Sequence, residues 1–110
     1  MYIQGLVTLT GAAQSLSTAT GTVGFSGKTT LQGVSVREIT LQPDSTNSNV
    51  VKVGDSNISS TLFSLQLPIP VATIPPPPYT MGPYGGNAVG LDEIYVLGTL
   101  NELLHVGILI

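Results

Sequence analysis

The sequence predicts an all-β protein, a small β-sandwich formed by a single domain that spans residues 1–110. Two runs rich in β-branched residues, 34–41 and 50–53, flank a segment that consists almost wholly of turn formers. This pattern is typical of strands joined by a polar loop. The end of the chain adds apolar residues at every second position, as expected for a strand with one buried face. Together these observations predict strands near residues 2–10, 34–42, 49–54, 58–67, 91–97 and 103–110.

The first predicted strand, residues 2–10, has most of its apolar residues at odd-numbered positions, with polar residues between them. The Ser- and Thr-rich stretch that follows favours irregular structure, because these side chains compete for backbone hydrogen bonds. We expect Leu16 to insert into the core from this stretch. Residues 20–27 contain three glycines and fit a loop as well as an edge strand.

The second and third predicted strands, 34–42 and 49–54, are close enough to form a hairpin. The apolar residues of the earlier strand are even-numbered before Arg37 and odd-numbered after it, so they change faces there. A bulge near Arg37, or a strand covered on both faces, would explain the change. A second turn at residues 54–57 then leads to the strand near 58–67.

A long Pro-rich loop or arm at residues 68–90 lies within a stretch, residues 57–91, that contains no charged residue. Prolines lack the amide donor of a central strand, and the run at 75–78 favours polyproline II over about 12 Å, at ~3.1 Å per residue. Loops of this length are usually functional or disordered. The segment fits either a lid over one end of the core or an arm that docks on a neighbouring subunit, anchored by Tyr79 and Tyr84.

The C-terminal strands near 91–97 and 103–110 are separated by a connection of hairpin size. In the last strand the apolar residues share one face, and His105 lies on the other. No lysine or proline guards this strand, so it should not be left as an open edge in solution.

The composition is unusually poor in charge. Charged residues are 8% of the chain, against about 25% in typical proteins. A formal net charge of -3 with three cationic residues cannot neutralise a row of phosphates, which argues against nucleic-acid binding. The chain has no cysteine, no apolar run of membrane-spanning length and no signal-peptide pattern at its start. We therefore expect a soluble protein that is made inside the cell and has no membrane contact.

No constellation of residues supports catalysis. The single histidine, His105, is better explained by a structural bond to Glu102 or to the backbone than by a role as general base. Asp92 and Glu93 would point to opposite faces of a strand, which does not suit paired-carboxylate chemistry. Residues 24–29 keep only the last part of a phosphate-binding loop. Turns alone account for a set of possible calcium ligands: Asp44, Asn47, Asn49 and Asp55. We expect no enzyme activity, cofactor or metal.

Four segments, residues 9–17, 36–44, 49–58 and 91–99, resemble small structural proteins of tailed bacteriophages and related viruses. The most specific parts are the VxVGDSN turn at 51–57 and the LDEIYVLGT strand at 91–99. The resemblance implies a β-sandwich or jelly-roll fold, assembly as a trimer, and a virion component that cements or decorates the capsid. The chain departs from the pattern where it inserts residues 68–84 in place of a short turn.

We therefore expect a homotrimer on the capsid surface, made in the host cytoplasm and bound to the major capsid protein or another virion protein. Its scarcity of charge indicates a surface that is covered by partners. The residues expected in the interface belong to the arm and the last strand: Ile74, Pro76, Tyr79, Tyr84, Leu104, Val106, Ile108 and Ile110. Two alternatives are a tail-fibre or spike-type module that binds host glycans through its tyrosines, and a shell protein that forms a lattice.

Overall fold

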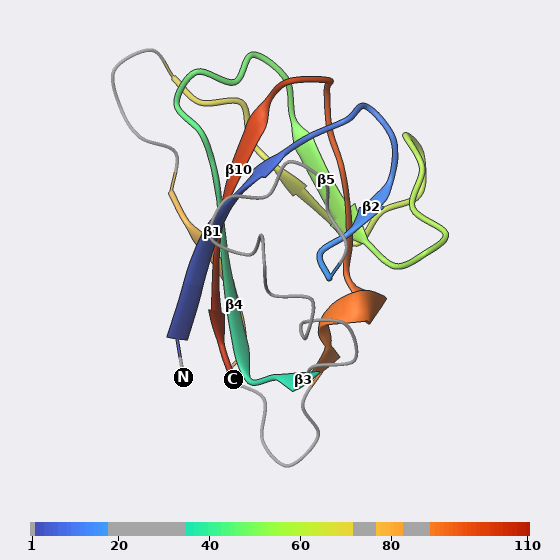
Figure 1. The fold of residues 1–110 in the computed structure, drawn as a ribbon. Coiled ribbons are helices and arrows are strands. Elements are labelled where there is room, and N and C mark those ends of the chain that lie inside the picture. The colour runs from blue at the N-terminus through green and yellow to red at the C-terminus, as the bar shows by residue number, and fades with distance from the viewer. Residues whose placement is uncertain (1, 18–34, 72–76, 83–88) are drawn as a thin grey trace.

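The computed structural model describes residues 2–17, 35–71, 77–82 and 89–110. Two four-stranded antiparallel sheets face each other, so the predicted β-sandwich is confirmed (Figure 1). The strands of the first sheet are, in spatial order, β1 (Tyr2–Thr8), β10 (Leu103–Leu109), β4 (Glu38–Pro43) and β7 (Tyr79–Met81). Because β10 is paired along both sides, the last strand is not an open edge, as its apolar sequence predicted.

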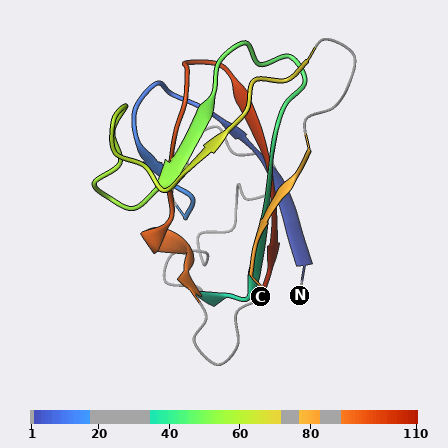
Figure 2. The ribbon, with the colours of Figure 1, turned by 180° about the vertical axis from the view of Figure 1, so that it is seen from behind.

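The second sheet has the order β2 (Gln14–Ser15), β9 (Tyr95–Leu97), β5 (Val51–Gly54) and β6 (Leu65–Leu67). A short third sheet joins β3 (Ser35–Val36) to β8 (Val89–Gly90), next to the 3-10 turn η2 (Leu91–Glu93). Seen from behind, this small sheet lies at the end of the molecule near both termini (Figure 2).

The order in which the chain visits the two sheets is that of a jelly roll. Of the eight strands that the described residues form in the two large sheets, only β5 and β6 are consecutive neighbours within one sheet. Every other connection between consecutive strands of these sheets crosses from one sheet to the other, as in the double Greek key of jelly-roll proteins.

Two predicted hairpins are therefore wrong. The connection at residues 44–50 joins β4 in one sheet to β5 in the other, and the connection at 98–102 does the same for β9 and β10. The physical reason is that packed sheets lie about 10 Å apart, a distance that a loop of hairpin length also spans. Each strand gains more by placing its apolar face against the common core than by pairing with its sequence neighbour.

The change of faces at Arg37 is confirmed. Arg37 separates β3 from β4, and its backbone N–H donates to the carbonyl of Leu109 at 2.7 Å. Because the chain bends there, Val36 before the bend and Ile39 after it are both fully buried although their positions differ in parity.

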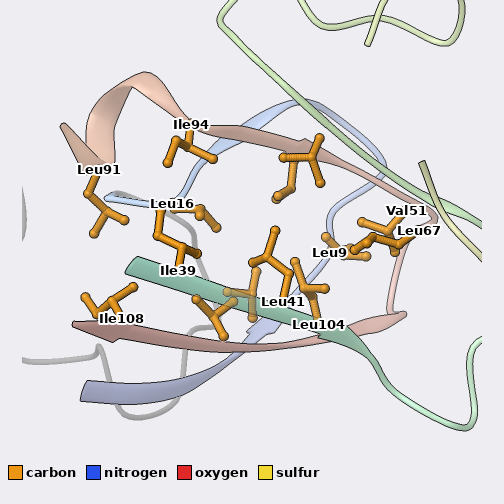
Figure 3. Close-up of a cluster of buried hydrophobic side chains, with 14 of the residues drawn as sticks. Leu9, Leu16, Ile39, Leu41, Val51, Leu67, Leu91, Ile94, Leu104 and Ile108 are labelled. Carbon is orange, nitrogen blue, oxygen red and sulfur yellow. The ribbon is translucent and has the colours of Figure 1, made fainter. Parts of the chain in front are cut away.

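The core lies between the two sheets, where buried side chains from both layers point toward one another (Figure 3). Strand β4 shows the expected alternation, with Ile39 and Leu41 fully buried. Leu16 is 1% exposed, so its predicted insertion into the core is confirmed. Fully burying one such aliphatic side chain contributes about 1.5–3 kcal/mol, which makes this core the main source of stability.

The strand predicted near 58–67 is mostly a loop, and only Leu65–Leu67 pairs with β5. Within the loop, the Ser59 hydroxyl accepts hydrogen bonds from the N–H groups of Thr61 and Leu62. The Ser59 hydroxyl thus binds backbone N–H groups that a neighbouring strand would otherwise bind. Such local bonds of Ser and Thr side chains compete with strand pairing. The predictions for residues 20–27 and for the first half of the proline run, residues 75 and 76, concern positions outside the described residues.

Candidate interaction surfaces

Three connections meet at one end of the sandwich: residues 9–13, 44–50 and 98–102, hereafter the loop end (Figure 1). Backbone hydrogen bonds hold the first and third together. The Leu9 N–H donates to the Glu102 carbonyl at 2.8 Å, and the Asn101 N–H donates to the Leu9 carbonyl at 2.9 Å. Asn101 has a positive φ of 69°, a conformation that asparagine tolerates and that lets the turn close tightly.

Asn47 joins the 44–50 loop to the start of β10. Its side chain is 5% exposed and forms two hydrogen bonds with Leu103: Nδ2 donates to the carbonyl at 2.8 Å, and Oδ1 accepts from the N–H at 3.0 Å. The Asn47 amide therefore fixes the 44–50 loop to the first residue of β10, whose carbonyl also accepts the N–H of Asp44 at 3.1 Å.

Glu102 anchors the same loop from the other side. Its carboxylate accepts the N–H of Ser48 at 2.7 Å and the N–H of Asn49 at 3.2 Å. Burial acts to raise the pKa of Glu102, but the bonds from Ser48 and Asn49 together outweigh it, so the pKa lies below its ordinary value.

Asp44 binds two partners at the loop end. One carboxylate oxygen contacts Nε2 of His105 at 2.8 Å, and the other accepts from the hydroxyl and the N–H of Thr46. The bonds from Thr46, followed by that from His105, lower the pKa of Asp44 to about 2. The predicted bond of His105 to Glu102 or to a backbone group is therefore wrong: His105 contacts the Asp44 side chain, and the Glu102 carboxylate binds the loop backbone.

The Thr46–Asp44–His105 cluster does not have the arrangement of a nucleophilic triad. In such a triad the histidine lies between the hydroxyl and the carboxylate, so that it can take the hydroxyl proton. Here the carboxylate lies in the middle and binds both groups. The cluster therefore fixes the loop to β10 and does not activate Thr46.

The pKa of Asp44 predicts a specific response to acid. A carboxyl with a lowered pKa in the folded state stabilises the fold above its unfolded pKa, near 3.8, and loses this contribution as the pH falls toward about 2. Asp44→Asn should lower the free energy of unfolding by about 1 kcal/mol at pH 6, and the difference from the wild type should vanish near pH 2. Urea unfolding at pH 6, 4 and 2 measures this. Asp92→Asn, which alters an exposed carboxylate at η2, is the matched control and should not change the profile in this way. A pH-independent deficit in Asp44→Asn would contradict the assignment.

Exposed apolar side chains lie on the side of the sandwich that includes β6, residues 68–71 and β7, hereafter the apolar side. In both views the segment after β6 and strand β7 lie on the same side of the molecule (Figures 1 and 2). Ile69 is 50% exposed, Val71 is 72% exposed, and Tyr79 on β7 is 43% exposed. All three belong to the charge-free stretch 57–91. Exposed apolar groups without neighbouring charge are typical of interaction sites.

A second exposed apolar site lies in the loop between β5 and β6. Leu62 and Phe63 are exposed there and line a shallow pocket of about 140 Å³ together with Gly54, Asp55, Asn57 and Ser64. Lys52 covers the Phe63 ring, with Nζ 4.8 Å from its centre, and donates to the Ser60 carbonyl at 2.5 Å. The lysine makes this site less apolar than the apolar side.

The structure separates the predicted interface residues into three groups. Tyr79 and Ile110 are exposed, as an interface requires. Three residues of β10 fill the core, so their prediction as interface residues is corrected: Leu104, Val106 and Ile108. The remaining three lie outside the described residues: Ile74, Pro76 and Tyr84. The error arose because an apolar strand face looks the same in sequence whether it packs on its own chain or on a partner.

Ile69 and Val71 belong to the predicted arm at 68–90 but were not named among the expected interface residues, although the sequence contains a signal. They alternate with Pro68 and Pro70, which cannot donate to a strand ladder and so keep this segment out of a sheet interior. An apolar residue excluded from the sheet interior is a good candidate for exposure. The polar contacts of Asn47 were also missed, because a turn-forming role explained that residue equally well.

No protein-family model, curated protein or solved structure matches this chain. Within the described ranges there is no group of three or more His, Cys, Asp and Glu residues that could hold a metal ion. The same part of the chain contains no helix with the length and apolar character needed to cross a membrane. The structure thus defines a small jelly-roll domain with a hydrogen-bonded loop end and an exposed apolar side.

Proposed function

We propose that the protein is a virion structural component, a decoration or cement protein that stabilises the capsid by binding the shell as a homotrimer. The observation that carries the proposal is the apolar side, where Ile69, Val71 and Tyr79 are exposed in a stretch without charge. A surface of this kind favours contact with a partner, because burying it removes apolar area from water and desolvates no charged group of that stretch.

The fold is compatible with this function. Jelly rolls occur in viral capsid proteins, and also in lectins and cupins. The resemblance of segments such as 51–57 and 91–99 to phage structural proteins favours the first class. The major capsid protein is the proposed partner, and the capsid surface is the proposed location after synthesis in the host cytoplasm.

The proposal is tested first by the mass of the purified protein in solution. We expect a mass of three chains of 11.4 kDa each, both at low salt and at about 1 M salt. Contacts made by apolar burial are not weakened by the screening that ~1 M salt produces. A monomer at high protein concentration, or a trimer that dissociates in salt, would contradict this mode of assembly.

The second test is binding to capsids assembled without this protein, from the major capsid protein encoded in the same genome. Val71→Glu should weaken binding by at least about tenfold, because a carboxylate would have to be buried without a partner. Leu62→Glu is the matched control: it introduces the same charge at a similarly exposed leucine, 59% exposed, in the β5–β6 loop. Absence of wild-type binding, or equal loss in both variants, would reject the proposed role of the apolar side.

A further inference from the structure

The loop between β5 and β6, residues 55–64, packs on the face of the second sheet that points away from the core. Val53 lies in the core, so by strand alternation Gly54 faces outward. A Cβ placed on Gly54 would lie 3.5 Å from the side chain of Ile58, and Ile58 is buried. Ile58 thus holds the loop against β5 at a position that has no side chain of its own.

Hydrogen bonds fix both ends of this loop. At its start, the Asp55 carboxylate accepts the Asn57 N–H at 2.8 Å, and the Asp55 carbonyl accepts the Ile58 N–H at 3.0 Å. At its end, the Ser64 N–H donates to the Val53 carbonyl at 2.9 Å. The pocket in this loop is therefore formed before a ligand arrives, which reduces the entropy lost on binding.

The pocket combines apolar and hydrogen-bonding side chains. Leu62 and Phe63 supply the apolar part, and Asp55, Asn57 and Ser64 carry polar side chains that can accept or donate hydrogen bonds. Its volume of about 140 Å³ is close to that of a cavity of about 150 Å³ that holds benzene. The pocket therefore has room for one six-membered ring.

Charges of both signs adjoin the pocket. Asp55 lines it, and Nζ of Lys52 lies 4.8 Å from the centre of the Phe63 ring. A bound anion would face the Asp55 carboxylate, and a bound cation would lie near the Lys52 ammonium. The ammonium is also bonded to the Ser60 carbonyl at 2.5 Å. The pocket therefore suits a neutral ligand better than a charged one.

We infer that this pocket binds one neutral sugar ring, a pyranose unit of a glycan. A pyranose has a face of C–H groups, whose small positive charges are attracted to the negative face of an aromatic ring. Phe63 is 38% exposed with Lys52 in place, so ring surface remains for this contact. The hydroxyls of the sugar would bind the polar side chains of the pocket, which fix its orientation.

The pocket stays accessible when the apolar side is covered. In both views the β5–β6 loop projects on the side of the molecule opposite to residues 68–71 and β7 (Figures 1 and 2). A protein bound to the capsid through the apolar side could therefore bind a sugar at the same time. Sugar binding does not depend on capsid binding, because the residues that line the pocket do not belong to the apolar side.

The test is an NMR titration of the isotope-labelled full-length protein with free sugars at pH 6. The neutral sugars are glucose, galactose, mannose and N-acetylglucosamine, and the charged counterparts are glucuronic acid and glucosamine. One ring in a shallow pocket should bind with a Kd of about 1–10 mM, so each sugar is added to about 100 mM. At least one neutral sugar should shift the amide signals of the residues that line the pocket. Each charged counterpart should bind more weakly than its neutral parent.

Substitutions then locate the site. Phe63→Leu keeps an apolar side chain but removes the aromatic face, so it should weaken binding at least about threefold. Asp55→Asn keeps an oxygen that can accept the Asn57 N–H but removes the charged acceptor, so it should also weaken binding. Tyr79→Ala is the matched control: it removes an exposed aromatic ring from the apolar side and should leave sugar binding unchanged. Unshifted amide signals outside the loop show that each variant is folded.

Several outcomes would overturn the inference. These are the absence of shifts with every neutral sugar, tighter binding of a charged counterpart, and unchanged binding by folded Phe63→Leu. Loss of binding in Tyr79→Ala alone would place the sugar on the tyrosine instead. Capsid binding is measured separately on Phe63→Ala, which should bind capsids like the wild type. Failure to bind sugars would therefore leave the proposed function standing, and failure to bind capsids would leave the sugar site standing.

Discussion

Replacing Ile108 with alanine should lower the free energy of unfolding by about 2–5 kcal/mol. Ile108 is fully buried, and its strand is paired on one side with Ile3 and on the other with Ile39. The substitution removes three heavy atoms from a site held by strands on both sides, so the surroundings cannot close the cavity fully. Urea unfolding followed by circular dichroism measures the change.

Ile110→Ala is the matched control, since it removes the same atoms two positions later, where the side chain is 36% exposed. It should cost less than about 1 kcal/mol. The comparison also shows whether the apolar face of the last strand packs in the core or forms a subunit interface. If Ile108→Ala left stability unchanged and instead dissociated the oligomer, Ile108 would belong to the interface and the core assignment would be wrong.

The fold class could be predicted from the sequence because strand periodicity is a local property. The alternation that begins at Leu104 fixes which side chains of the last strand share a face, and the change of parity at Arg37 marks a bend without any knowledge of distant residues. Leu16 was predicted in the core because it is an isolated apolar residue in a polar stretch. These inferences need only the neighbouring positions.

Strand pairing could not be predicted because it depends on distant segments. The 44–50 connection has the length of a hairpin loop, yet β4 pairs with β10, whose residues lie more than 60 positions away in the chain. Nothing in the loop itself distinguishes a hairpin from a crossing between sheets. The choice is made by the sum of apolar contacts in the core, to which β1, β5 and β9 also contribute.

The same limit applies to the candidate surfaces. The charge-free stretch and Tyr79 could be found from composition, but the contacts of Asn47 and Glu102 join positions 53 to 56 residues apart. A loop rich in Asp, Asn and Ser predicts a turn whether or not its side chains reach another strand. Only the jelly-roll crossing brings these side chains to the start of β10.

Asn47 provides the second large expected effect. Asn47→Asp should lower the free energy of unfolding by about 2–4 kcal/mol at pH 7, because the introduced carboxylate would face the Leu103 carbonyl in a site where the native side chain is 5% exposed. The new group keeps the shape of asparagine but loses the Nδ2 donor. Asn57→Asp, in an exposed turn, is the matched control and should change stability by less than about 0.5 kcal/mol.

The defect should depend on pH, because the introduced carboxyl destabilises the fold when it is ionised, whereas the ionised carboxylate of Asp44 stabilises it. Burial and the nearby carbonyl raise the pKa of the introduced carboxyl in the folded state, so its protonated form is favoured there. When protonated, it can donate to the Leu103 carbonyl and accept from the Leu103 N–H, as the native amide does. The stability difference between variant and wild type should therefore shrink as the pH falls from 7 to about 3 and grow again as it rises. A difference that stayed constant over this range would mean that the two bonds to Leu103 do not hold the loop end together.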